Sequence, residues 1–104
     1  MAKLSIVFGY RNREVLRVKR CLDSLKNQTF IDFDVIFIDY GSNDSYATQI
    51  RSLVEQYAFV RYYYLYTVGH PWNRSHALNT GIRVSDASYI LMGVGRINIV
   101  KMAI

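Results

Sequence analysis

The stretch that decides the fold is residues 34–44, which read DVIFIDYGSND. It consists of a short apolar strand that ends in an acidic residue, Asp39, followed at once by a turn containing Gly41 and Ser42. This order is typical of parallel sheets in which a ligand lies just beyond the carboxyl ends of the strands. We therefore expect the polar residues that follow each strand to form one functional site.

Apolar patterning on either side of this stretch predicts alternating strands and helices. Short apolar runs predict strands over residues 4–8, 34–39, 59–66 and 89–92. Apolar residues three or four apart predict helices over residues 14–27, 46–57 and 74–84. The order βαβαβαβ implies an α/β three-layer sandwich with a mainly parallel central sheet and right-handed crossovers.

Length and composition predict one domain over residues 1–104. The chain is 51% hydrophobic and 20% charged, and no apolar run reaches the length of a membrane span. The apolar run Leu4–Phe8 is too short for a signal-peptide core, so we expect a cytoplasmic location. The single cysteine, Cys21, falls at a predicted buried helical position, which favours a structural thiol over a nucleophile.

The net charge is +5, which favours anionic partners. Basic residues cluster around the first predicted helix, at Arg11, Arg13, Arg17, Lys19 and Arg20. This cluster is either a solvated helix face or a surface for a phosphorylated ligand, an acidic membrane or nucleic acid. Only charge favours nucleic acid, so we predict no nucleic-acid partner. The tyrosines of residues 62–64 are expected to pack within a strand rather than to stack on bases.

Two groups of polar residues could bind a ligand. Asp39 is either an acceptor for the donors of a nucleobase or ribose or a turn-forming residue. Arg74, His76 and Asn79 fall near the start of the third helix, where free N–H groups attract a diphosphate. The alternative is that Arg74 is solvated and Asn79 bonds a loop. A metal-binding role for His76 is disfavoured because no second ligand lies four residues away.

Four segments together resemble a known family. These are SIVFGYRNRE (5–14), LDSLKNQTFIDFDVIFIDYGSND (22–44), NRSHALNTGI (73–82) and SDASYILM (85–92). In this order and spacing they closely resemble the N-terminal half of family 2 glycosyltransferases. The resemblance implies the GT-A fold, in truncated form, and the use of a nucleotide-diphosphate sugar as a substrate.

The resemblance also implies roles for particular residues. The turn after the second strand would contact base and ribose, the turn after the first would lie against the nucleotide, and the Ala77, Asn79 and Gly81 helix would line the sugar-phosphate side. With Arg74 included, the predicted nucleotide-sugar-binding residues are Tyr10, Asn12, Asp39, Tyr40, Ser42, Arg74 and Asn79. Two positions depart from the family: Gly9 replaces a proline, and Tyr40 replaces the second acidic residue of the turn.

The largest departure from the family follows Met92. Family members hold Mg²⁺ or Mn²⁺ there with an Asp-x-Asp motif, whereas this chain reads GVGRIN over residues 93–98. The metal carboxylates are absent, so no metal or cofactor is assigned, and only Arg96 could partly replace the cation's charge. Relatives continue beyond the position of Ile104 with an acceptor-binding half and a general base, so no catalytic residue is assigned here.

We therefore expect a glycosyltransferase that binds a nucleotide-diphosphate sugar for hexose transfer to a glycan or glycoconjugate acceptor. Without the metal motif and the acceptor half, this chain is expected to be weak or inactive, so whether it is an enzyme stays open. The alternative is a non-catalytic binding module that keeps the fold and self-associates. The apolar and basic tail, residues 97–104, would be either an extra strand or an interface for a homo-oligomer.

Overall fold

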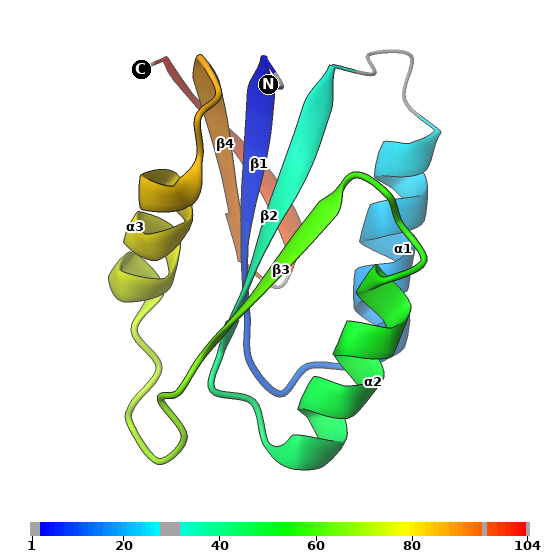
Figure 1. The fold of residues 1–104 in the computed structure, drawn as a ribbon, viewed down its shortest axis with the longest axis vertical. Helices are drawn as coiled ribbons and strands as arrows, with labels where there is room; N and C mark the ends of the chain where they lie inside the picture. Colours follow the sequence, from blue (N-terminus) through cyan, green and yellow to red (C-terminus); the bar gives the residue numbers. More distant parts are fainter. Residues whose placement is uncertain (1–2, 28–31, 95, 104) are drawn as a thin grey trace.

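The computed structural model describes residues 3–27, 32–94 and 96–103, which form a sheet with helices on both faces (Figure 1). The elements along the chain are β1 (Leu4–Tyr10), α1 (Val15–Lys26), β2 (Phe33–Tyr40), α2 (Asp44–Val54), β3 (Val60–Leu65), α3 (Arg74–Val84), β4 (Tyr89–Val94) and β5 (Arg96–Ala103). Helices α1 and α2 cover one face of the sheet and α3 covers the other. The predicted three layers are confirmed.

The strands form one sheet in the order β3-β2-β1-β4-β5. Strands β1 to β4 are mutually parallel, as predicted, and β5 runs antiparallel to β4. Of the two interpretations of the tail, the extra strand is therefore confirmed for Arg96–Ala103, while Ile104 lies outside the described residues. The carboxyl ends of β1, β2 and β3 meet at the lower edge in Figure 1, which we call the carboxyl edge.

The bounds of some elements differ from the predictions. The first two strands run further towards the C-terminus than expected and end at Tyr10 and Tyr40. The second helix was predicted to carry Tyr57, but α2 ends at Val54. Tyr57 follows in a turn, where its N–H donates to the carbonyl of Val54, and it still packs into the core at 7% exposure. The apolar spacing of the helix extends to Tyr57 because this residue, although it lies after the helix, is also buried in the core.

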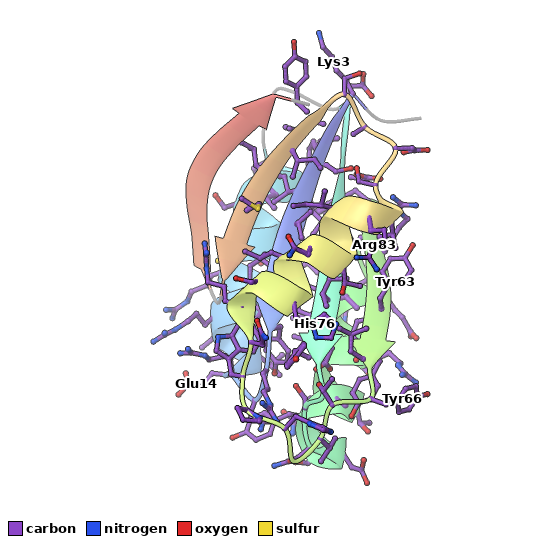
Figure 2. The ribbon with its side chains drawn as sticks, turned by 90° about the vertical axis from the view of Figure 1, so that its left-hand side faces the viewer. Lys3, Glu14, Tyr63, Tyr66, His76 and Arg83 are labelled. Carbon is purple, nitrogen blue, oxygen red and sulfur yellow. The ribbon has the colours of Figure 1, made fainter. Side chains whose placement is uncertain are left out.

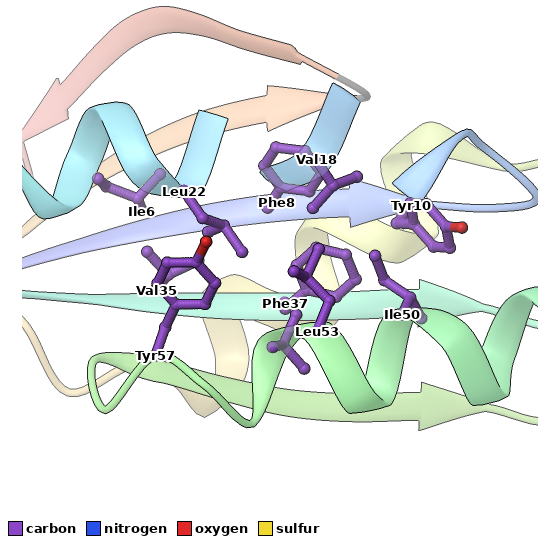
Figure 3. Close-up of a cluster of buried hydrophobic side chains, with 11 residues drawn as sticks. Ile6, Phe8, Tyr10, Val18, Leu22, Val35, Phe37, Ile50, Leu53 and Tyr57 are labelled. Carbon is purple, nitrogen blue, oxygen red and sulfur yellow. The ribbon is translucent and has the colours of Figure 1, made fainter. Parts of the chain in front are cut away.

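Two hydrophobic cores lie on opposite faces of the sheet, since successive residues of a strand point to opposite sides. The core beneath α1 and α2 is built around the stacked rings of Phe8 and Phe37, whose centroids are 5.1 Å apart (Figure 3). The core beneath α3 contains Val7, Ile36 and Ile38. Burial of the central strands on both faces explains their unbroken apolar runs.

The sequence predicts a structural role for Cys21 and no membrane-spanning segment. Cys21 is half-buried on α1 and packs against the core beneath α1 and α2, the environment expected of a structural thiol. Over residues 3–27, 32–94 and 96–103, the structure contains no helix with the length and apolar character needed to cross a bilayer.

Gly81 lets α3 approach β1 closely. A Cβ at this position would lie 2.2 Å from Cγ1 of Val7, closer than two carbon atoms can approach. We predict that Gly81→Ala lowers the free energy of unfolding by about 1–3 kcal/mol through overpacking. Urea denaturation followed by circular dichroism measures this change.

The companion variant Val7→Ala removes the clashing methyl group. In the Gly81→Ala background it should recover part of the lost stability, whereas on its own it should destabilise the protein by leaving a cavity. Alanine normally favours a helix over glycine, so a Gly81→Ala protein as stable as the parent would contradict the close approach.

Candidate functional site

Asp39 is completely buried at the end of β2, on the face covered by α1 and α2. Its Oδ1 accepts a hydrogen bond from the N–H of Ser42 at 3.0 Å, and its Oδ2 accepts one from the hydroxyl of Tyr62 at 2.6 Å. Burial, and next the hydrogen bond to Asp39, raise the pKa of Tyr62. Both carboxylate oxygens thus have protein partners, and the geometry matches the turn-forming role that the sequence left open.

Ser42 joins the loop after β1 to the turn after β2. Its Oγ accepts a hydrogen bond from the N–H of Asn12 at 3.0 Å, and the N–H of Asn43 donates to Oδ1 of Asn12 at 2.8 Å. Asn12 has a φ of 47°, in the left-handed region that asparagine tolerates better than most residues. The hydroxyl of Tyr64 donates to the carbonyl of Ser42 at 2.9 Å. The ends of three strands are therefore tied together at the carboxyl edge.

Gly41 brings the turn after β2 against the loop after β3. Its φ of 72° is left-handed, and an added Cβ would lie 2.7 Å from the backbone atoms C of Thr67 and N of Val68. Only glycine combines this conformation with this contact. The close backbone approach thus explains why the turn contains a glycine at position 41.

Tyr10 lies within the core, not on the surface. It is 1% exposed, packs against Phe37 at 5.4 Å between ring centroids, and donates from its hydroxyl to the carbonyl of Arg13 at 2.6 Å. Burial raises the pKa of Tyr10 from its ordinary value of 10.0 to about 12. The predicted contact of Tyr10 with a nucleotide would therefore have to be indirect, through the loop that its hydroxyl holds.

Tyr40 lies on the opposite face of the sheet from Asp39 and is 4% exposed. Its hydroxyl is 2.9 Å from Nδ1 of His76, its ring meets the edge of Trp72 at 5.5 Å, and the guanidinium of Arg11 lies 5.9 Å from the ring centroid. We call Arg11, Tyr40, Trp72 and His76 the Tyr40 cluster. Because its ring is enclosed in this cluster, Tyr40 does not present a face on which a base could stack.

Trp72 had no role in the sequence prediction. The added Cβ of a residue at position 9 would lie 3.3 Å from its ring carbon Cη2, so Gly9 gives the space that the indole occupies. Both departures from the family therefore lie beside Trp72: the ring of Tyr40 contacts the indole, and a Cβ at position 9 would crowd it. A bulky residue beside the only proline of the chain was the signal available in the sequence.

Arg74 and Asn79 are exposed on α3. The helix begins after Asn73, whose Oδ1 accepts a hydrogen bond from the N–H of His76 at 2.9 Å. This cap uses one of the free N–H groups at the start of the helix and leaves those of Arg74 and Ser75 for other partners. The start of α3, where the sequence predicts anion binding, is thus exposed at the surface.

The structure brings together some of the predicted site residues and separates others. Asn12 and Ser42 are joined by a hydrogen bond, and Asp39 accepts a hydrogen bond from the N–H of Ser42. Asp39 faces the core under α1 and α2, whereas Asn79 belongs to α3 on the other side of the sheet (Figure 2). The expectation that all these side chains converge on one site is therefore wrong for Asp39 and Asn79.

A divalent metal ion needs several ligating side chains close together. No group of three His, Cys, Asp or Glu suited to metal binding occurs in the part of the chain that the structure describes. The sequence GVGRIN after Met92 contains no carboxylate, and Gly95 lies outside the described residues. Hard cations such as Mg²⁺ need oxygen ligands, so this donor set differs from that of metal-dependent relatives.

Comparisons with known proteins agree with this architecture. The family model described as glycosyl transferase family 2 matches residues 5–92. The chain is similar to the solved structures of the mannosyltransferase PcManGT from Pyrobaculum calidifontis in complex with GDP-Man and Mn²⁺ (18% identity, TM-score 0.74) and of S. aureus TarS 1–349 in complex with UDP-GlcNAc (20% identity, TM-score 0.74). Their similarity in fold agrees with the predicted architecture.

The matched regions are the N-terminal parts of those enzymes. Each match covers 89% of this chain, but only 27% of the mannosyltransferase chain and 26% of the TarS chain. The chain thus spans about a quarter of the length of these solved relatives. No curated protein matches its sequence.

The buried carboxylate of Asp39 should contribute to the stability of the fold. We predict that Asp39→Ala lowers the free energy of unfolding by about 3 kcal/mol, because the N–H of Ser42 and the hydroxyl of Tyr62 lose their acceptor in a buried site. The matched variant Asp39→Asn keeps the shape and one acceptor, so it should cost only about 1 kcal/mol. Equal effects of the two variants in urea denaturation would contradict the assigned hydrogen bonds.

Alkaline pH should destabilise the protein through its buried tyrosines. The folded-state pKa of Tyr10, about 12, exceeds its ordinary value of 10.0, so the neutral phenol favours folding below pH 10 and this contribution is lost as pH rises towards 12. The free energy of unfolding should fall over this range, and less steeply in Tyr10→Phe. The control Tyr66→Phe, at a side chain that is 91% exposed, should keep the parent's slope.

Proposed function

Because the chain belongs to glycosyl transferase family 2, we propose that it binds a nucleotide-diphosphate sugar at the carboxyl edge of its sheet. The observation that carries the proposal is the junction of Asn12, Ser42 and Asn43, whose hydrogen bonds hold the loops after β1 and β2 together. A site already held in place loses little conformational entropy when it binds. The complexes of similar solved structures with GDP-Man and UDP-GlcNAc support this ligand class.

The nucleoside would lie over the junction. Oδ1 of Asn12 accepts from Asn43, which leaves the two donors of the Asn12 side-chain amide for acceptors on a base or ribose. Asn12 and Asn43 are both exposed, whereas Ser42 and Asp39 are buried. In this proposal Asn12 contacts the ligand directly, and Ser42, Asp39 and Tyr10 act as positioning residues beneath it.

The diphosphate would lie towards α3. Arg11 is held between the ring of Tyr40 and the carbonyl of Thr67, at 3.5 Å from the latter, and Arg74 is exposed at the start of α3. These two guanidinium groups and the free N–H groups of the helix start would offset the phosphate charges. Asn79, one turn further along the helix, would face the sugar-phosphate part. Cationic side chains would thus stand where metal-dependent relatives use a metal ion.

In the whole protein, the bound donor would supply a hexose to a glycan or glycoconjugate acceptor. The described residues contain neither the metal carboxylates nor an assigned general base, so we propose that these residues alone transfer the sugar weakly or not at all. A cytoplasmic location is part of the same proposal.

A second candidate is a non-catalytic module that keeps the fold and self-associates. Two observations favour it: the Tyr40 cluster encloses a position that is acidic in the family, and β5 ends the sheet as an edge strand. An edge strand presents one row of backbone groups that a second copy could pair with. In this candidate the chain would be a homodimer without a nucleotide ligand.

Isothermal titration calorimetry with UDP, UDP-glucose and GDP, each with and without Mn²⁺, tests the two candidates. We predict binding in the micromolar range that does not depend on Mn²⁺. Arg74→Ala should weaken it about tenfold, because a charged hydrogen bond to phosphate is lost. Arg83→Ala, in the last turn of the same helix and also exposed, is the matched control and should leave affinity unchanged.

The outcomes separate the candidates. Absence of heat with every nucleotide, together with a dimer in analytical ultracentrifugation, would favour the non-catalytic module. Binding that requires Mn²⁺ would contradict the proposal that cationic side chains replace the metal ion, although not the nucleotide-binding function itself.

A further inference from the structure

The outer face of α1 combines basic side chains with an exposed leucine. Val18 and Leu22 are the fully buried residues of this helix and face the sheet. Leu16 lies outside that stripe and is 56% exposed. Arg13, Arg17 and Arg20 are also exposed, and they lie three before, one after and four after Leu16 along the chain. Arg13 precedes Glu14, the N-cap of the helix, whereas the other three residues lie on the helix itself. We call Arg13, Leu16, Arg17 and Arg20 the basic α1 face.

Among the described residues, no ion pair involves the arginines of this face. The ion pairs among the described residues are Lys19 with Asp23 on α1 and Arg61 with Asp34 on the sheet. Asp23 is therefore already paired, with its Oδ2 2.7 Å from Nζ of Lys19. Over residues 11–20 the only acidic residue is Glu14, against five basic ones. An excess positive charge remains on the outer side of the helix.

The basic α1 face also lies next to the carboxyl edge. Helix α1 follows directly from β1, and Glu14, its N-cap, lies on the opposite side of the molecule from Tyr63 and Tyr66 (Figure 2). Arg13 and Leu16 are therefore at the end of the helix nearest to the site proposed above. A surface bound to this face would lie beside the nucleotide-sugar site without covering β3.

We propose that the basic α1 face docks on an anionic lipid surface. The three arginines would pair with lipid phosphates and carboxylates, and Leu16 would enter the boundary between headgroups and acyl chains. Nucleic acid would satisfy the arginines but would leave the exposed Leu16 in water. The presence of an exposed apolar side chain among unpaired cations is what favours a membrane, and the proposal does not depend on the nucleotide-sugar function.

Co-sedimentation with lipid vesicles tests this proposal. The protein should bind phosphatidylcholine vesicles that contain about one third phosphatidylserine, and binding should weaken as salt is raised. The double variant Arg17→Glu/Arg20→Glu should bind at least tenfold more weakly, since each arginine near such a surface contributes about fivefold. Leu16→Ser should also bind about tenfold more weakly but keep the parent's salt dependence.

The control variant is Arg83→Glu, which changes the charge by the same amount per residue on α3, across the sheet. It should lower binding much less than either α1 variant, and circular dichroism should show that all variants are folded. Equal binding to pure phosphatidylcholine, or an equal loss in Arg83→Glu, would overturn the proposal. Binding of single-stranded DNA without any binding of anionic vesicles would overturn it as well.

Discussion

The buried carboxylate of Asp39 is the constraint on which the carboxyl edge depends. A charge removed from water has to be compensated by hydrogen bonds, and Asp39 finds its two partners in different elements, the turn after β2 and the side chain of Tyr62 on β3. Fixing the turn places Ser42, and Ser42 in turn holds the loop of Asn12. A residue that touches no exposed surface thus determines the geometry of the surface above it.

Successive side chains of a strand point to opposite faces of the sheet, so the last two residues of β2 lie in different environments. Asp39 belongs to the hydrogen-bonded junction over the core of α1 and α2, and its neighbour Tyr40 belongs to the aromatic cluster beneath α3. The nucleoside and diphosphate parts of the proposed site follow this division, with amide groups of Asn12 on one side and the cations Arg11 and Arg74 on the other. Tyr40 and Gly9, the two positions that depart from the family, both lie next to Trp72.

The sequence predicted the order of elements and the family, because both depend on patterns read locally: apolar runs, helical spacing and turn residues. It also predicted that Asn12 and Ser42 would lie together, since both follow parallel strands. It could not predict that Asp39 and Tyr10 would be buried, because their partners Tyr62 and the carbonyl of Arg13 are defined only by the fold. The end of α2 was misplaced because Tyr57 continues the helical spacing from a turn.

The contact at Gly41 has a mechanical consequence for the proposed site. With the turn after β2 packed directly against the backbone of Thr67 and Val68, there is no slack between these two segments. A side chain at position 41 would push these two segments apart. The spacing between the turn after β2 and the start of the segment that leads to α3 is therefore set by the absence of a side chain at a single residue.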